Sequence, residues 1–156
     1  MFLKKHKKLI ALSVAILISC FLLLAIYGKL FHPSENLKKL EHWVGFFEVF
    51  FIISLFFYRN NWQIWMITAI IFASFAGYSI FWYRIKLPCA CMGTLIPHVS
   101  LLSFFLDLIF FALSLGVACL LQIKRSALYF WTCLGCTFFL IGYAFAEKIY
   151  QKSILL

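Results

Sequence analysis

Two cysteines separated by a single residue, Cys89 and Cys91, form the most reactive pairing in the sequence. Alternate side chains of an extended segment point to opposite sides, so a bond between these sulfurs needs a tight turn and a strained ring. Strained, exposed disulfides exchange readily with other thiols. Pro88 stiffens the chain before the pair, and Gly93 allows unusual dihedrals after it. The pattern predicts a functional dithiol, with Cys89 and Cys91 as the catalytic residues of a thiol-disulfide oxidoreductase if the chain is an enzyme.

The same segment has two alternative interpretations. Its soft side chains would suit Cu(I), although no firm ligand spacing connects them. These metal-ligand candidates are Cys89, Cys91, Met92 and His98. The other alternative is that the two cysteines are unrelated loop residues.

A second cysteine pair, Cys133 and Cys136, has the Cys-x-x-Cys spacing of redox motifs. It lies inside an apolar run, where cysteine commonly packs as a small hydrophobic residue. The two are therefore secondary redox candidates. If they are active, an outer and an inner cysteine pair would suggest a transmembrane electron relay.

The elements that position these residues are predicted to be membrane-spanning helices. Of the 156 residues, 65% are hydrophobic and only 12% are charged, against roughly 25% charged residues in soluble domains. A helix needs about 20 apolar residues to cross a bilayer core, and the uncharged runs of this chain are close to that length. We predict an all-α membrane protein, a four-helix transmembrane bundle with a fifth C-terminal transmembrane helix, as one domain over residues 1–156. The predicted spans are 9–27, 43–58, 62–83, 99–123 and 127–146.

Charge placement predicts the orientation. Four lysines precede the first span, which places the N-terminus in the cytoplasm by the positive-inside rule. These are Lys4, Lys5, Lys7 and Lys8. With five spans, the loop of Cys89 then lies outside, in the periplasm if the chain resides in a bacterial inner membrane, where disulfides persist. The net charge of +9 is scattered over short segments, so nucleic acid is not an expected partner. The membrane spans imply membrane lipid as a partner, and the predicted dithiol implies a periplasmic thioredoxin-like or client protein.

Two carboxylates fall within predicted spans. Glu48 and Asp107 are expected in the outer half of the membrane, where each should face the bundle interior with a partner. Lys29, at the outer end of the first span, is the natural partner of Glu48. The three residues are predicted either to form an ion pair that sets helix register or to handle protons near the dithiol or a bound quinone.

Residue spacing also predicts which helix faces pack. Ser100, Ser103, Asp107 and Ser114 share one stripe of the fourth span, which should face inward. In the third span, small residues recur every four positions and allow another helix to approach closely. They are Ala69, Ala73 and Gly77. Aromatic residues gather near span ends and are expected to anchor at the lipid headgroups. They include Tyr27, Trp43, Tyr58, Trp62, Trp65, Trp82, Tyr83, Tyr129, Trp131 and Tyr143.

These residues together resemble a known family, the methylamine utilisation protein MauE group, which is related to DoxX-like membrane proteins. The similar positions are Gly28-Lys29-Leu30, Glu48 and Pro88-Cys89-Ala90-Cys91-x-Gly93. The resemblance covers residues 9–123 and implies a four-helix, redox-associated membrane protein that helps to mature a disulfide-containing periplasmic protein. It also implies a role similar to that of quinone-linked disulfide-forming bundles.

The chain departs from the family pattern in two ways. It has Met92 where many relatives carry glycine, and its last span is an addition to the four helices of the family. The competing functional class is a non-enzymatic membrane assembly factor or chaperone, in which the same cysteines would hold a client or brace the loop.

Overall fold

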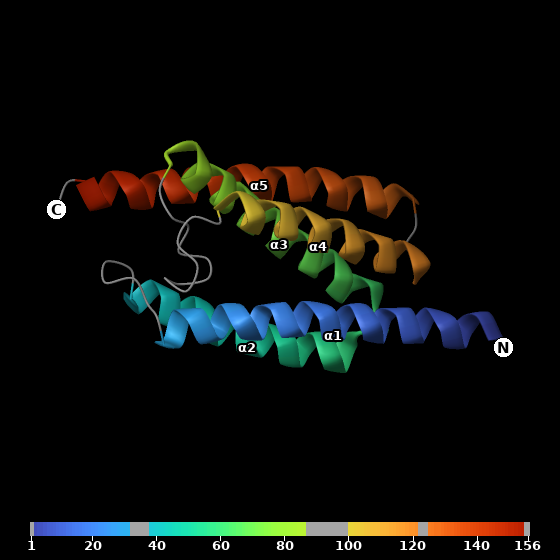
Figure 1. Ribbon diagram of the computed structural model, residues 1–156. Helices are drawn as coiled ribbons and strands as arrows, with labels where there is room; N and C mark the ends of the chain where they lie inside the picture. The colour runs from blue at the N-terminus through green and yellow to red at the C-terminus, as the bar shows by residue number, and fades with distance from the viewer. Residues whose placement is uncertain (1, 32–37, 87–99, 122–124, 155–156) are drawn as a thin grey trace.

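The computed structural model describes residues 2–31, 38–86, 100–121 and 125–154, which form five helices in the order α1 to α5 (Figure 1). Their bounds are α1 Phe2–Phe31, α2 Lys38–Tyr58, α3 Trp62–Arg84, α4 Ser100–Leu120 and α5 Arg125–Ile154. No strand occurs in these described ranges. The predicted all-α class is confirmed.

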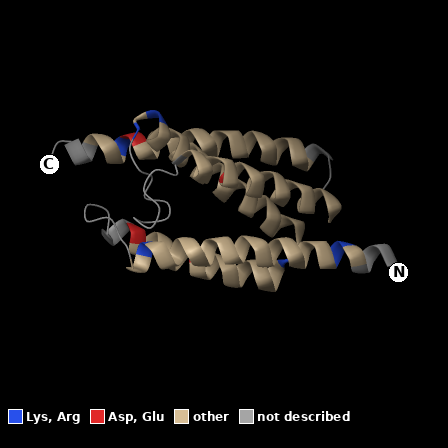
Figure 2. Cartoon of the chain, in the orientation of Figure 1, with Lys and Arg blue, Asp and Glu red and all other residues tan. Residues whose placement is uncertain are grey.

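All five helices are long and apolar enough to cross a membrane. The candidate spans are His6–Phe31, Glu41–Tyr58, Trp62–Arg84, Leu101–Leu120 and Ala127–Gln151. Charged residues gather towards the helix ends, with long uncharged stretches between them (Figure 2). Because a helix satisfies its backbone hydrogen bonds internally, this pattern suits a multi-pass membrane protein.

The helices form two packed groups. α1 packs along α2, whereas α3 packs along both α4 and α5, and α1 also contacts α4 (Figure 1). α3 is the most buried of the five and α5 the least, so α3 is the central helix. The two chain termini lie at opposite ends of the bundle (Figure 1), as expected for an odd number of spans.

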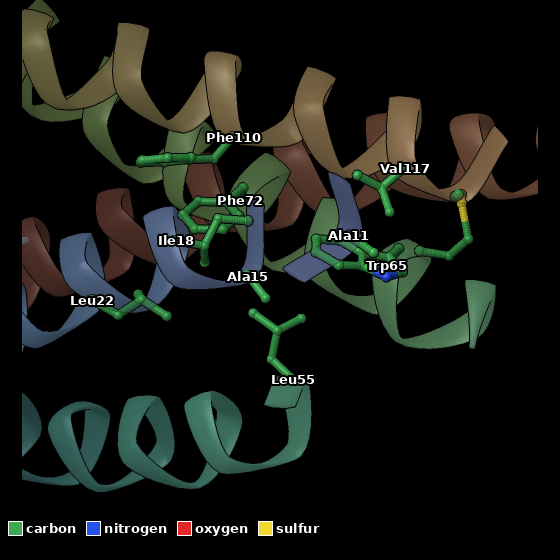
Figure 3. Close-up of a cluster of buried hydrophobic side chains, with 11 residues drawn as sticks. Ala11, Ala15, Ile18, Leu22, Leu55, Trp65, Phe72, Phe110 and Val117 are labelled. Atoms are coloured by element: carbon green, nitrogen blue, oxygen red, sulfur yellow. The ribbon is translucent and has the colours of Figure 1, made fainter. Parts of the chain in front are cut away.

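An apolar core joins the two groups. Ala11, Ala15, Ile18 and Leu22 recur at helical spacing along α1 and are fully or almost fully buried, and Figure 3 shows them with core residues of the other helices. The ring of Phe110 on α4 lies 5.1 Å from that of Phe72 on α3 and 4.8 Å from that of Phe21 on α1. These aromatic contacts connect the α1–α2 hairpin to the three remaining helices.

α3 and α5 approach each other at two glycines. A Cβ atom on Gly77 would collide with the backbone carbonyl of Phe139, and one on Gly142 would collide with the carbonyl of Ser74. Ala69 and Ala73, the other members of the predicted small-residue stripe, are buried with Gly77. The helix that packs closely against this stripe is α5. The sequence predicted α5 as an addition to a four-helix core.

Helix α2 begins earlier than the sequence predicted. It starts at Lys38 and not at residue 43, so Lys38 to Leu40 continue into the span. The prediction followed the apolar run, but a helix needs only backbone hydrogen bonds and can begin in polar residues. Within the candidate span, Glu48 lies seven residues after Glu41, about 10 Å deep.

The prediction that aromatics near helix ends are headgroup anchors is wrong for Trp65 and Trp82. Both are buried, and the indole N–H of Trp65 donates to the backbone carbonyl of Arg59 over 2.7 Å. The reason is the central position of α3, which surrounds its end residues with other helices. Trp43 and Tyr129, on less buried helices, are exposed as anchors require.

Candidate functional site

The predicted dithiol lies between two described helix ends. Cys89, Cys91, Met92 and His98 all fall in residues 87–99, outside the described residues. Before this segment, the amide of Ile85 donates to the carbonyl of Phe81, and Lys86 has a φ of 58°. This left-handed conformation ends α3 and costs a residue other than glycine about 1 to 2 kcal/mol. The end of α3 and the start of α4 lie at the bundle end opposite the N-terminus (Figure 1).

The predicted partners Lys29 and Glu48 form a salt bridge between α1 and α2. Their exposed fractions are only 4% and 5%. Lys29 lies near the C-terminal end of α1, and helical side chains lean towards the N-terminus of their own helix. That direction leads deeper into the bundle. The long lysine side chain therefore carries its ammonium group down to the level of Glu48.

Asp107 brings α3 and α4 into the same polar region. Its carboxylate is 3% exposed and accepts a hydrogen bond of 3.1 Å from the hydroxyl of Ser79. It is also close enough to Lys29 and Glu48 for both charges to act on it. We call Lys29, Glu48, Ser79 and Asp107 the charged cluster. Each of the helices α1 to α4 contributes one side chain to the charged cluster.

The charged cluster lies in the half of the bundle that contains the end of α3 and the start of α4. Asp107 is the eighth residue of α4, about 10 Å from its start at Ser100, and Glu48 has a similar depth in its span. Ser103 and Ser114, predicted to share an inward stripe with Asp107, are also buried. The side chain of Ser100 lies outside the described residues.

One oxygen of the charged cluster has no partner within the described part of the chain. Glu48 Oε1 is bonded to Lys29, but Glu48 Oε2 is buried and receives no hydrogen bond there. A buried acceptor without a donor is costly, commonly by about 1 to 3 kcal/mol. The charged cluster therefore has a vacant acceptor position.

Sequence reasoning missed two buried polar residues near this site. Ser79 follows Phe72 and Ala76 at helical spacing on the buried face of α3, a signal that the sequence contained. Glu41 is 4% exposed and lies in the first turn of α2. It was overlooked because the predicted span began two residues later.

The secondary redox candidates do not join the charged cluster. Cys133 and Cys136 are free and exposed on α5, as are Cys20 on α1 and Cys119 on α4. Cys133 and Cys136 therefore lie on the outer face of α5, whose buried positions are Gly135, Gly142 and Ala146. In the described ranges, no three His, Cys, Asp or Glu side chains gather as metal ligands.

Comparisons with protein-family models, curated proteins and solved structures found no match to this chain. A functional assignment therefore depends on the chemistry of its residues. Two features offer such chemistry: the predicted Cys89–Cys91 pair in the sequence between α3 and α4, and the charged cluster near the end of α3 and the start of α4.

Proposed function

We propose that this chain is a membrane thiol-disulfide exchange protein of the MauE type that acts on periplasmic protein thiols through Cys89 and Cys91. One observation carries the proposal. The helix ends that flank the Cys-x-Cys segment in the sequence, the end of α3 and the start of α4, lie at the bundle end opposite the N-terminus (Figure 1). A cytoplasmic N-terminus therefore means a periplasmic dithiol.

The proposed location is the bacterial inner membrane, with five crossings. The five apolar helices support a multi-pass protein, and the lysines in the first turns of α1 support a cytoplasmic N-terminus. In the periplasm, the Cys89–Cys91 disulfide would meet secreted proteins whose own cysteines must be oxidised.

The proposed reaction conserves thiols and electrons. A client thiolate attacks one sulfur of the Cys89–Cys91 disulfide and forms a mixed disulfide, which releases the other cysteine as a thiolate. A second client thiolate then displaces the first cysteine. The client leaves with a new disulfide, and the Cys89–Cys91 pair leaves with two electrons and two protons as a dithiol. A membrane quinone is the class of oxidant that would restore the disulfide.

The test begins with a variant in which Cys20, Cys119, Cys133 and Cys136 are serine, so that only the dithiol remains. Adding Cys89→Ser or Cys91→Ser leaves a single thiol, whose thiolate can attack the disulfide of an oxidised periplasmic client and release one client thiolate. Because no second thiol remains to resolve the mixed disulfide, we expect it to persist as a band that disappears on reduction. The matched control lacks all six cysteines and should capture nothing.

Orientation is tested in the same background. After mild reduction, a membrane-impermeant maleimide should label Cys89 or Cys91 in intact spheroplasts. Labelling only after lysis would contradict the periplasmic placement. If neither single variant captures a protein and both remain fully active, a redox role is excluded. Copper or zinc that co-purifies with the wild type and is lost in both variants would then identify a metal site.

A further inference from the structure

The charges of the cluster do not balance. Lys29 supplies one positive charge, whereas Glu48 and Asp107 supply two negative charges if both are ionised. All three groups are buried within or at the end of candidate spans. A net charge buried within the membrane is unfavourable, because the low-dielectric interior does not solvate an ionised side chain. Some positive species must offset the extra carboxylate.

No second cation is buried beside the charged cluster among the described side chains. On α2, Glu41 is buried and interacts electrostatically with Tyr78 of α3, and His42 beside it is only half-buried. Arg84 of α3 is exposed and donates to the hydroxyl of Tyr143 on α5. Lys148, the only described cation near the C-terminal end of α5, is exposed. The excess negative charge of the cluster is therefore not cancelled by these neighbours.

We propose that the charged cluster is a proton-binding site that holds one exchangeable proton at neutral pH. Asp107 carries the proton, because Glu48 is already neutralised by its salt bridge to Lys29. Binding converts the carboxylate of Asp107 into a carboxylic acid, and no electrons move. The proposal is independent of the chemistry assigned to Cys89 and Cys91.

The vacant acceptor supports this assignment independently of the charge count. Glu48 Oε2 is buried without a donor from the described residues, whereas a carboxylate normally accepts hydrogen bonds at both oxygens when buried. The described side chains therefore leave the charged cluster short of one hydrogen-bond donor as well as one positive charge. The hydroxyl of Ser79 can still donate to the carbonyl oxygen of a protonated Asp107, which matches the contact at Asp107 Oδ2.

The test counts protonated carboxyl groups by infrared spectroscopy of the full chain in lipid at pH 7. The carbonyl stretch of a carboxylic acid is separate from that of a carboxylate, and it shifts in heavy water if the proton exchanges. The chain has only five acidic residues, so assignment by substitution is practical. We expect the wild type to show one such group in the charged cluster, with a band that shifts in heavy water.

Charge balance predicts a different count for each variant. Asp107→Asn and Glu48→Gln should each abolish the band, since either leaves one carboxylate paired with Lys29. Lys29→Met should show two protonated groups, because no cation remains. If Lys29→Met does not fold, the double variant Lys29→Met with Glu48→Gln should show one group, on Asp107.

Matched controls exclude other carboxyl groups. Glu41→Gln and Glu147→Gln should both retain the wild-type band, and size-exclusion elution with helical content should show that each variant is folded. A wild type without the band would overturn the proposal. So would a band that persists in both Asp107→Asn and Glu48→Gln, or one that does not shift in heavy water.

Discussion

The charged cluster and the α3–α5 contact bury opposite kinds of surface in the same bundle. In the charged cluster, side chains from α1 to α4 meet through a salt bridge and a hydrogen bond. Between α3 and α5, the absence of side chains at Gly77 and Gly142 lets backbone approach backbone. Neither contact depends on hydrophobic side chains that exclude water.

The difference shows how helices associate in a solvent as apolar as their own surfaces. Lipid offers little hydrophobic drive between helices, so association depends on polar pairing or on close van der Waals packing. The salt bridge and hydrogen bond of the charged cluster can change when a carboxyl group gains or loses a proton. The steric fit between α3 and α5 does not involve an ionisable group and cannot change in this way. We therefore expect the charged cluster to be the responsive part of the bundle and the α3–α5 contact to be permanent.

The largest effect is expected from Lys29→Met. This substitution leaves Glu48 without its cation, and breaking a buried ion pair from one side costs about 3 to 5 kcal/mol. Adding Glu48→Gln should recover much of the loss, because no unpaired charge remains. Thermal unfolding in detergent measures both variants. If Lys29→Met and the double variant lose the same amount of unfolding free energy, the lone Glu48 carboxylate is not the cause of the loss, and the ion-pair explanation is contradicted.

A smaller but substantial loss is expected from Gly77→Ala. Overpacking usually costs about 1 to 3 kcal/mol, and here the obstacle is the backbone of Phe139, which cannot rotate away as a side chain would. Gly116→Ala on α4 is the matched control. Its added methyl group meets no atom within 4 Å, so it should be neutral or stabilising by up to about 1 kcal/mol through helix propensity. Unfolding measurements that show equal effects for the two variants would contradict the close contact.

The smallest effect is expected from Ser79→Ala. It removes the hydrogen bond to Asp107, and a bond of this kind contributes about 1 kcal/mol, or somewhat more if the acceptor is charged. Ser114→Ala is the control, because that equally buried hydroxyl donates to the carbonyl of Phe110 in its own helix and so does not bridge two helices through this bond. A loss of stability no greater than that of the control would show that Ser79 does not support the charged cluster.

Much of the fold could be predicted from the sequence because a bilayer makes simple demands on a chain. Each span needs an apolar run of sufficient length, and each buried charge needs a partner. These rules predicted five helices and an inward direction for Glu48 and Asp107. The helix boundaries were less accurate, and α1, α2 and α5 all extend beyond the predicted spans, since hydrogen bonding in a helix does not stop where the apolar run stops.

The neighbours of each helix could not be read from its own sequence. A small-residue stripe indicates that some helix approaches closely, but only the packing shows that α5 docks against Gly77. Likewise, Trp65 has the sequence position of a headgroup anchor, yet the central placement of α3 buries it.

Composition and residue spacing establish that the chain is helical and membrane-spanning, because these properties depend on contacts between each segment and its solvent. The meeting of Lys29, Glu48, Ser79 and Asp107 depends on the packing of four helices against one another. Ser79 in particular becomes part of the charged cluster only when α3 lies beside α4, which brings its hydroxyl to Asp107 across 28 residues of sequence. Segment properties are local and can be read along the chain, whereas a site built from distant residues exists only after the helices pack.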